Sequence, residues 1–166
     1  MHRTDEGLVE LVLLEWKYTE SYRLRRPDPA KDKIRWGRYG AALMALDGPV
    51  RGDLLAFSDL LDEPFYQLMR QQLLAHALET DCAHGADKVR VGHVLPEANV
   101  AYQQSLHRGS QRALGSTVGQ VWSRLLRTPD RFMSIDSSRF LDPAITSAEY
   151  VARYGDAEHA SKVAPR

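Results

Sequence analysis

The sequence predicts an α/β domain in which a mixed central sheet is flanked by helices. Two segments, 8–18 and 86–95, alternate apolar side chains with the period of a strand. Helical spacing occurs between and after them, and strands separated by helices are typical of this fold class. The 166 residues suffice for one domain with a sizeable core. We place that domain at 1–155 and expect a flexible tail at 156–166.

The composition sets the background for any functional claim. Lys plus Arg equals Asp plus Glu at 22 each, so net charge gives no global argument for a nucleic acid or a membrane as partner. The single cysteine excludes an internal disulfide and fits a reducing compartment. The first residues lack a signal-peptide pattern, and no apolar run is long enough to cross a bilayer. We therefore expect a cytoplasmic protein with no membrane partner.

The first strand, expected over 8–18, has two apolar faces. One face carries three apolar residues and then Glu15 and Lys17. The other face carries Val12, Leu14, Trp16 and Tyr18. Because both faces are mostly apolar, we expect a central strand that is covered on both sides.

A tight turn is expected directly before this strand, over Asp5-Glu6-Gly7. Hairpin turns join two strands, so a partner strand should precede the turn. Only four residues precede Asp5. We therefore expect that the N-terminal part of the fold is missing from this chain.

The remaining elements are expected from periodicity and end signals. Residues 19–33 form a polar loop, and Asp62 is the expected N-cap of the clearest helix, with Pro64 in its first turn. A capping box of Thr146 and Glu149 starts the last helix. Further helices are expected over 34–46, 53–61, 65–79, 98–107 and 117–127, and further strands over 86–95 and 131–135.

Glu15 and Lys17 suit a metal site, because alternate residues of a strand share a face and lie roughly 6–7 Å apart. The carboxylate can bind a hard cation, and the backbone carbonyl of Trp16 between them can reach the same ion. The lysine can hold or polarise a water aimed at a phosphorus atom. A simpler interpretation is a strand that leaves the core and becomes polar. The basic loop that follows favours the site.

Eight basic residues and three acids lie between Lys17 and Arg38, with aromatic residues interleaved. Such a segment can hold a phosphate backbone, with aromatic rings available for stacking. The alternative is a solvated loop. The candidate nucleic-acid-binding residues are Arg23, Arg25, Arg26, Lys31, Lys33, Arg35 and Arg38.

Four further polar positions need partners. Gln67 and Gln71 lie one helical turn apart on a stripe shared with leucines, and they face either the site or a half-exposed flank. His93 lies on an apolar strand face, where a satisfied core histidine is expected. Asn99 follows a strand end and is expected to cap a helix.

Three longer strings, LVLLEWKYTESY, EPFYQLMRQQLLA and VGHVLPEANVAYQQS, resemble a restriction-endonuclease-like group of the PD-(D/E)XK nuclease superfamily with an EWKYTES motif. The resemblance extends from about Leu11 to about Leu141. It implies a mixed sheet flanked by helices, a divalent metal (Mg²⁺ or Mn²⁺) and hydrolysis of DNA phosphodiester bonds. Glu15 and Lys17 match the second acid and the lysine of that motif. In that superfamily the following helix often aims a glutamine at the site, and Gln67 or Gln71 would fit this role, with Gln67 favoured.

The superfamily also uses an earlier aspartate on the strand before the E-x-K strand. Asp5 is the one aspartate upstream of Glu15, and its place in the expected turn does not suit that role. We therefore expect little cleavage by this polypeptide. Two alternatives stay open: a catalytically inactive nucleic-acid-binding protein of the same fold, and an interaction subunit. DNA is the expected partner, and a homodimer is compatible with the sequence.

Overall fold

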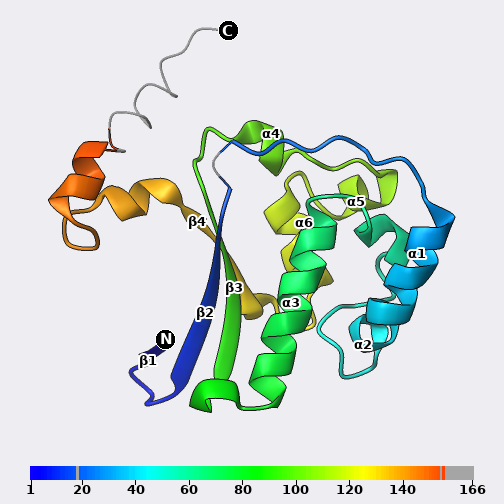
Figure 1. Ribbon diagram of the computed structural model, residues 1–166, viewed down its shortest axis with the longest axis horizontal. Coiled ribbons are helices and arrows are strands. Elements are labelled where there is room, and N and C mark those ends of the chain that lie inside the picture. The colour runs from blue at the N-terminus through cyan, green and yellow to red at the C-terminus, as the bar shows by residue number, and fades with distance from the viewer. Residues whose placement is uncertain (18, 154, 156–166) are drawn as a thin grey trace, which may run out of the picture.

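The computed structural model describes residues 1–17, 19–153 and 155 and shows a four-stranded mixed sheet flanked by helices (Figure 1). The expected fold class is confirmed. The strands are β1 (His2–Arg3), β2 (Val9–Trp16), β3 (Lys88–Leu95) and β4 (Phe132–Asp136). They lie in the order β1-β2-β3-β4, with β1 antiparallel to β2 and the other neighbours parallel. The expected tail over 156–166 lies outside the described residues.

Helices connect and cover the strands. The α-helices are α1 (Pro29–Arg35), α2 (Ala41–Met44), α3 (Phe65–Thr80), α4 (Val100–Gln103), α5 (Gly109–Leu114) and α6 (Val118–Leu125). A π-helical turn (Trp36–Gly40) joins α1 to α2. Short 3-10 helices are Phe57–Leu60, Ala83–Gly85, Pro129–Arg131 and Ser137–Leu141, and residues 148–153 are also helical. Within the described part of the chain, no helix combines the length and apolarity that a membrane span requires.

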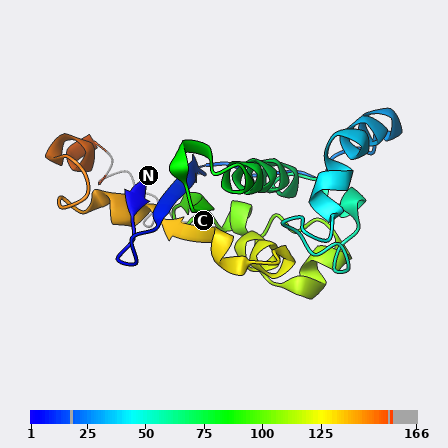
Figure 2. The same cartoon turned by 90° about the horizontal axis from the view of Figure 1, so that it is seen from below.

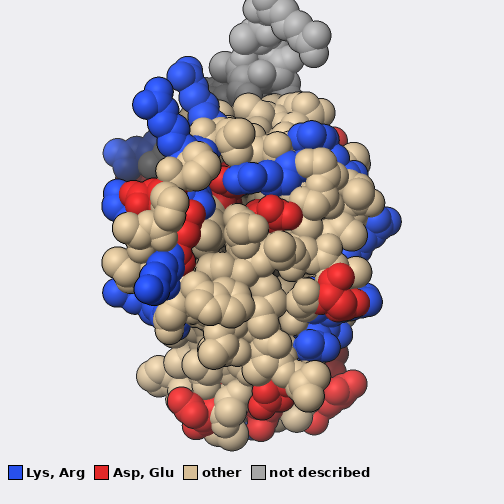
Figure 3. Space-filling view, turned by 90° about the vertical axis from the view of Figure 1, so that its right-hand side faces the viewer, with Lys and Arg blue, Asp and Glu red and all other residues tan. Residues whose placement is uncertain are grey.

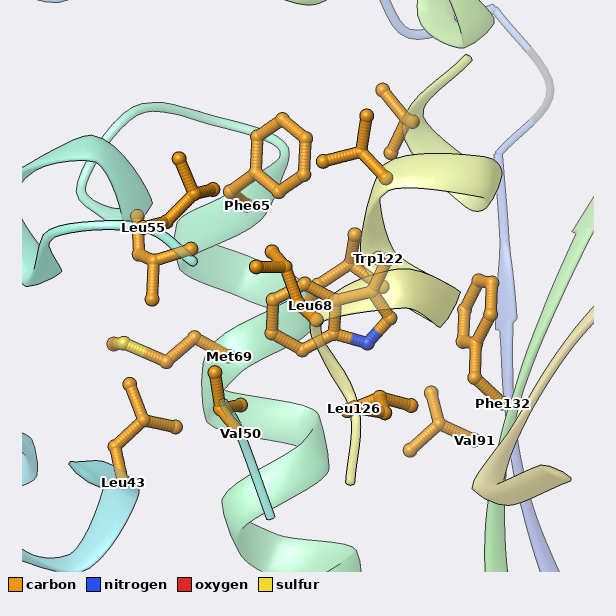
Figure 4. Close-up of a cluster of buried hydrophobic side chains, with 14 of the residues drawn as sticks. Leu43, Val50, Leu55, Phe65, Leu68, Met69, Val91, Trp122, Leu126 and Phe132 are labelled. Carbon is orange, nitrogen blue, oxygen red and sulfur yellow. The ribbon is translucent and has the colours of Figure 1, made fainter. Parts of the chain in front are cut away.

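Helices α1, α2, α3, α5 and α6 form two layers on one side of the sheet, whereas the helical segment that follows β4 lies on the other side (Figures 1 and 2). Helices α3 and α6 lie next to the sheet, and α1 and α2 lie beyond α3 (Figures 1 and 2). The core sits between the sheet and the inner helices, where Trp122 of α6 is fully buried near Leu68, Leu126 and Phe132 (Figure 4). On α3 the buried positions recur at helical spacing: Phe65, Leu68, Met69, Gln72 and Ala75.

The expectation that β2 is covered on both faces is wrong. Leu11 and Leu13 pack against the core, but on the opposite face Leu14 is 48% exposed and Trp16 is 37% exposed. Phe140 approaches the Trp16 ring, with 4.8 Å between ring centroids, but this contact leaves Leu14 and Trp16 more than one third exposed. An alternating apolar pattern records which residues share a face and not whether another layer covers it.

The first helical segment begins earlier than expected, at Pro29 instead of residue 34. The Asp28 side chain accepts a hydrogen bond from the Lys31 N–H and caps the helix, with Pro29 in its first position. The expected helix over 53–61 is reduced to Phe57–Leu60. For α1, the cap Asp28 followed by Pro29 was the sequence signal that indicates the start of the helix.

Asp62 is not the cap of α3. Its side chain is fully buried and accepts a hydrogen bond of 2.6 Å from Arg108 Nε, while Pro64 occupies the N-cap position. The last helix also begins differently: Ser147 Oγ accepts from the Tyr150 N–H, whereas the Thr146 hydroxyl donates to a carbonyl oxygen of the preceding turn. The expected capping box is therefore wrong, although a helix is present.

The expectations for the second half of the chain hold in large part. Strands β3 and β4 and helix α6 match the segments expected at 86–95, 131–135 and 117–127. The segment 98–107 contains only the four-residue α4, and α5 was not expected. Asn99 caps α4 as expected, since its side chain accepts from the Tyr102 N–H.

Candidate active site

Glu15 and Lys17 lie together at the carboxyl end of β2. Lys17 Nζ is 3.0 Å from Glu15 Oε1, and the backbone N–H of Lys17 donates to Val94 O, which extends the pairing with β3 past Trp16. The Lys17 side chain is 3% exposed, whereas the Glu15 side chain is 33% exposed. The expected arrangement of the pair on one side of the strand is confirmed.

Both glutamines of α3 reach this pair. Gln67 Nε2 donates to Glu15 Oε1 over 2.7 Å, and Gln67 Oε1 accepts from Lys17 Nζ over 2.6 Å. Gln71 Nε2 donates to the other carboxylate oxygen of Glu15 over 3.1 Å. Because the two residues are one turn apart, a single helix face presents both amides to the end of β2. The alternative of a half-exposed flank is excluded for both.

Lys17 remains charged despite its burial. Desolvation would lower the pKa of Lys17, but its hydrogen bonds to Glu15 and Tyr22 and their charges together raise the pKa above its ordinary value. The ammonium group donates to Glu15 Oε1, Gln67 Oε1 and, over 3.3 Å, the Tyr22 hydroxyl. A fixed positive charge therefore stands beside the half-exposed carboxylate.

His93 links the site to the core. It lies opposite Glu15 in the parallel pairing of β2 with β3 and is 1% exposed, as expected of a core histidine. Its Nδ1 is 2.6 Å from the Tyr102 hydroxyl, and its Nε2 is 2.8 Å from Gln71 Oε1. Sequence reasoning missed this connection because it depends on a helix packing across two strands.

The hydrogen-bond directions in this chain of groups are fixed. Burial, and then the nearby Lys17 charge, lower the pKa of His93 to about 4, so the ring is neutral at pH 7. Burial raises the pKa of Tyr102, so its hydroxyl keeps its proton and can donate to Nδ1. The proton of the ring then sits on Nε2 and donates to Gln71 Oε1. The Gln71 amide must in turn present its NH₂ group to Glu15, which orients the carboxylate.

Acidification should therefore weaken the fold through His93. The unfolded chain binds a proton at about pH 6.5 and the folded chain only at about pH 4, so this contribution is complete above pH 6.5 and is lost as pH falls toward 4. The loss should reach about 3 kcal/mol. Urea unfolding of the wild type and of His93→Gln between pH 7 and pH 4 measures it, with the exposed His84→Gln as control. Equal pH slopes for wild type and His93→Gln would contradict this assignment.

Glu63 is a second acid near the site that sequence reasoning missed. Its Oε2 accepts the backbone N–H of Gln67 over 3.2 Å, and burial raises its pKa against the opposing effects of that hydrogen bond and of Lys17. Glu63 comes directly before Pro64 at the start of α3. Its position just ahead of a helix that carries Gln67 was the available signal.

Asp5 does not join the site. It lies in the turn between β1 and β2, closed by a hydrogen bond from the Gly7 N–H to Thr4 O, whereas Glu15 lies at the other end of β2. The six residue-to-residue steps from Val9 to Glu15 alone span about 20 Å along the strand. Among the described residues, no group of three or more His, Cys, Asp or Glu side chains is arranged to hold a metal ion.

The basic segment divides into two groups. Arg25 pairs with Asp32 (2.8 Å), and Arg35 pairs with the same carboxylate (3.2 Å) and stacks over the Tyr66 ring. These two guanidinium groups hold the segment against the helices. Lys31 pairs with Asp28 on the surface. The exposed members are Arg23, Arg26, Lys31, Lys33 and Arg38.

Basic side chains gather on the upper left of the face that carries α1, with acidic groups among them (Figure 3). The segment from β2 to α1 crosses the same end of the molecule as the carboxyl end of β2 (Figure 1). The exposed cations therefore lie on the segment that leads away from Glu15 and Lys17.

Comparison with protein families gives one result that agrees with this geometry. Residues 2–156 match the model of a family described as Restriction Endonuclease associating with ARP. Comparisons with curated proteins and with solved structures gave no match. Since the match covers nearly the whole length, the chain belongs to this restriction-endonuclease-like family.

Proposed function

We propose that the protein is a metal-dependent nuclease that hydrolyses DNA phosphodiester bonds at the Glu15, Lys17 and Gln67 site. The observation that carries the proposal is the ion pair of Glu15 and Lys17, bridged by Gln67, at the open end of a parallel strand in a restriction-endonuclease-like chain. Membership in this family supports nuclease chemistry, and the geometry supports these residues.

Each residue has a distinct part in this proposal. Glu15 and the Trp16 carbonyl would hold Mg²⁺ or Mn²⁺, ions that prefer oxygen ligands and often use one or two carboxylates together with phosphate oxygens. The ion supplies charge stabilisation at the phosphate when it is bound. Lys17 places a fixed positive charge beside the Glu15 carboxylate. Its three N–H groups already donate to Glu15, Gln67 and Tyr22, so it contacts an attacking water or a phosphate oxygen only by exchanging one of these partners. Gln67 holds Glu15 and Lys17 at hydrogen-bonding distance and so fixes the geometry.

One carboxylate gives weak affinity for Mg²⁺, which then keeps most of its water. The sheet offers a place for another. Strand β1 pairs only with Val9 and Glu10, and His2 lies opposite Glu10. In the same antiparallel register, the residue five positions before His2 would lie opposite Glu15, with its side chain on the same face. An aspartate there would complete the acidic set.

A cleavage assay with an engineered N-terminal strand tests the proposal. The chain is extended so that β1 continues along β2, with Asp five positions before His2, and the control carries Asn at that position. We expect nicking of plasmid DNA by the Asp version with Mg²⁺ or Mn²⁺, little cleavage by the Asn version or the 166-residue chain, and none with EDTA. Equal absence of cleavage in all versions would argue against nuclease activity.

The exposed cations should bind the DNA backbone. Arg23→Ala combined with Arg26→Ala removes two exposed charges, so the slope of log affinity against log salt should fall by about 1.8 for duplex DNA. Arg3→Ala, an exposed arginine at the other end of the sheet, is the control and should leave the slope unchanged. Fluorescence anisotropy at several salt concentrations gives the slopes. Equal slopes for the double variant and the wild type would place the DNA elsewhere.

The second candidate function is nucleic-acid binding without cleavage. Both carboxylate oxygens of Glu15 already accept hydrogen bonds from protein donors, which favours a role in structure over metal binding. This candidate predicts that the extended Asp version binds DNA with the same affinity as the Asn version and cleaves neither plasmid nor linear DNA.

A further inference from the structure

A cavity of about 610 Å³ lies beside the candidate active site, bounded by α4, α6 and the carboxyl-terminal halves of β3 and β4. Ligands in sheets of parallel strands bind outside the carboxyl ends of the strands, and cavities of this size hold small organic ligands. Both the position and the volume of this cavity are typical of a ligand-binding site. Nothing in the proposed nuclease chemistry uses this space.

The cavity and the active site share one row of side chains across the sheet. Glu15 of β2 lies opposite His93 of β3, and His93 lies opposite Ser134 of β4. His93 and Ser134 line the cavity, and Tyr102, which is hydrogen-bonded to His93, forms another part of its wall. Since neighbouring strands are about 4.8 Å apart, the cavity begins roughly 5–10 Å from Glu15.

The charge of the lining differs from that of the active site. Among the described residues that line the cavity, Glu97 and Asp136 are acidic, and Arg124 is the one lysine or arginine. Arg124 already donates to the Leu114 carbonyl oxygen, and His93 is neutral at pH 7. The cavity therefore disfavours a phosphate group, whereas Lys17, one strand away, favours one.

The remaining lining combines apolar walls with hydrogen-bonding groups. Phe132, Val118, Leu95 and Ile135 supply apolar surface, and Gln103 and Ser134 supply polar groups. A flat heterocycle with donors at its edge fits such a lining, since the carboxylates accept hydrogen bonds from amino groups. In a nucleotide one sugar ring joins the phosphate to the base, so a phosphate at Glu15 and Lys17 and a base in the adjacent cavity are compatible with a single nucleotide.

We propose that this cavity receives one unstacked nucleobase of the DNA strand whose phosphate lies at Glu15 and Lys17, and that it prefers bases with an exocyclic amino group. This inference rests on the proposed function, because that function places the phosphate. Asp136 is the residue that we expect to accept from the amino group. Adenine, cytosine and guanine should therefore bind about tenfold more tightly than thymine.

The test is a binding measurement on the 166-residue protein, followed by ¹H–¹⁵N NMR. The probes are dAMP, dCMP, dTMP and deoxyribose 5-phosphate. We expect dAMP and dCMP to shift the amide signals of Gly119 and Ser134, with affinities about tenfold above that of dTMP. Deoxyribose 5-phosphate should leave these signals in place. Shifts caused equally by deoxyribose 5-phosphate, or no shifts with any probe, would overturn the proposal.

Three variants locate the binding. Ser123→Trp fills the cavity from α6 and should abolish the shifts, while Ala77→Trp on the exposed side of α3 adds the same side chain elsewhere and should preserve them. Asp136→Asn keeps an acceptor for the Ser138 N–H, which Asp136 caps, and should remove the preference for dAMP and dCMP over dTMP. Retained binding by Ser123→Trp would contradict the assignment to this cavity.

A short oligonucleotide distinguishes a strand from a free nucleotide. A single-stranded thymidine hexamer with one central cytidine should bind at least about tenfold more tightly than dCMP, because its neighbouring phosphates reach Lys17 and the basic segment. Equal affinity would overturn the assignment to a DNA strand. None of these readouts depends on cleavage, so base binding without plasmid nicking would defeat only the nuclease proposal. Nicking without base-dependent shifts would defeat only this one.

Discussion

Replacement of Lys17 or Glu15 should abolish DNA cleavage by the strand-extended protein. In Lys17→Met the stem is kept but the ammonium group is lost, so the phosphate loses its fixed positive charge. In Glu15→Ala the carboxylate that would hold the metal is lost. Each change should lower the cleavage rate about 10²–10³-fold, the effect of removing one preorganised group that stabilises charge in a transition state. Initial rates of plasmid nicking with Mg²⁺ or Mn²⁺ measure it.

Asp5→Ala is the matched control for these two variants. Asp5 is an exposed acid at the opposite end of β2, so its removal should leave the rate within about twofold of the parent. Circular dichroism should show that all three variants are folded. Loss of cleavage in Asp5→Ala would show that Asp5 takes part in metal binding and that the turn is not its functional position. Full activity in Lys17→Met would exclude the lysine from the chemistry.

Asp62→Ala should destabilise the fold more than any surface substitution. The side chain is fully buried between Arg108, at 2.6 Å, and Arg25, at 3.5 Å. The longer separation exceeds a hydrogen bond of good geometry, so the link to Arg108 contributes most. Arg108 is 34% exposed, so water can replace part of the interaction, and loss of this charged hydrogen bond should cost about 1.5–3 kcal/mol. Urea unfolding at pH 7 measures the loss.

The control for Asp62 is Asp28→Ala, which removes a half-exposed cap of α1 and should cost about 1 kcal/mol. Asp62 also matters to the site, because its partner Arg25 lies in the segment between β2 and α1, and this segment carries Tyr22, which accepts a hydrogen bond from Lys17. We therefore expect Asp62→Ala to weaken DNA binding as well as stability. A loss below about 1 kcal/mol in Asp62→Ala would show that the pair contributes little.

The site could be predicted from the sequence because its signals are local. Alternation along β2 put Glu15 and Lys17 on one face, and the one-turn spacing of Gln67 and Gln71 put both amides on one helix face. The two pairs of residues come into contact because α3 packs across the carboxyl end of β2. Tertiary packing sets which end of the strand the helix covers, and the sequence indicated this contact only through the resemblance, in which the following helix often aims a glutamine at the site.

The parts that could not be predicted depend on distant residues. Asp62 looked like a helix cap because its immediate neighbours fit that role, but its partner Arg108 is 46 residues away. Leu14 and Trp16 were expected to be buried because both faces of the strand are mostly apolar, yet no local pattern tells a covered sheet face from an open one. The nucleobase cavity likewise arises where α6 packs against β4, and no motif marks it.

The central claim, that a metal ion binds at the Glu15 end of β2, is tested most directly by paramagnetic broadening with Mn²⁺. In the strand-extended Asp version, substoichiometric Mn²⁺ should broaden the side-chain amide signals of Gln67 and Gln71, which hydrogen-bond to Glu15. The Asn version and Glu15→Ala should show much less broadening. Broadening centred on the Asp5 turn, or equal broadening in the Asp version and Glu15→Ala, would contradict the assignment of Glu15 as the metal ligand.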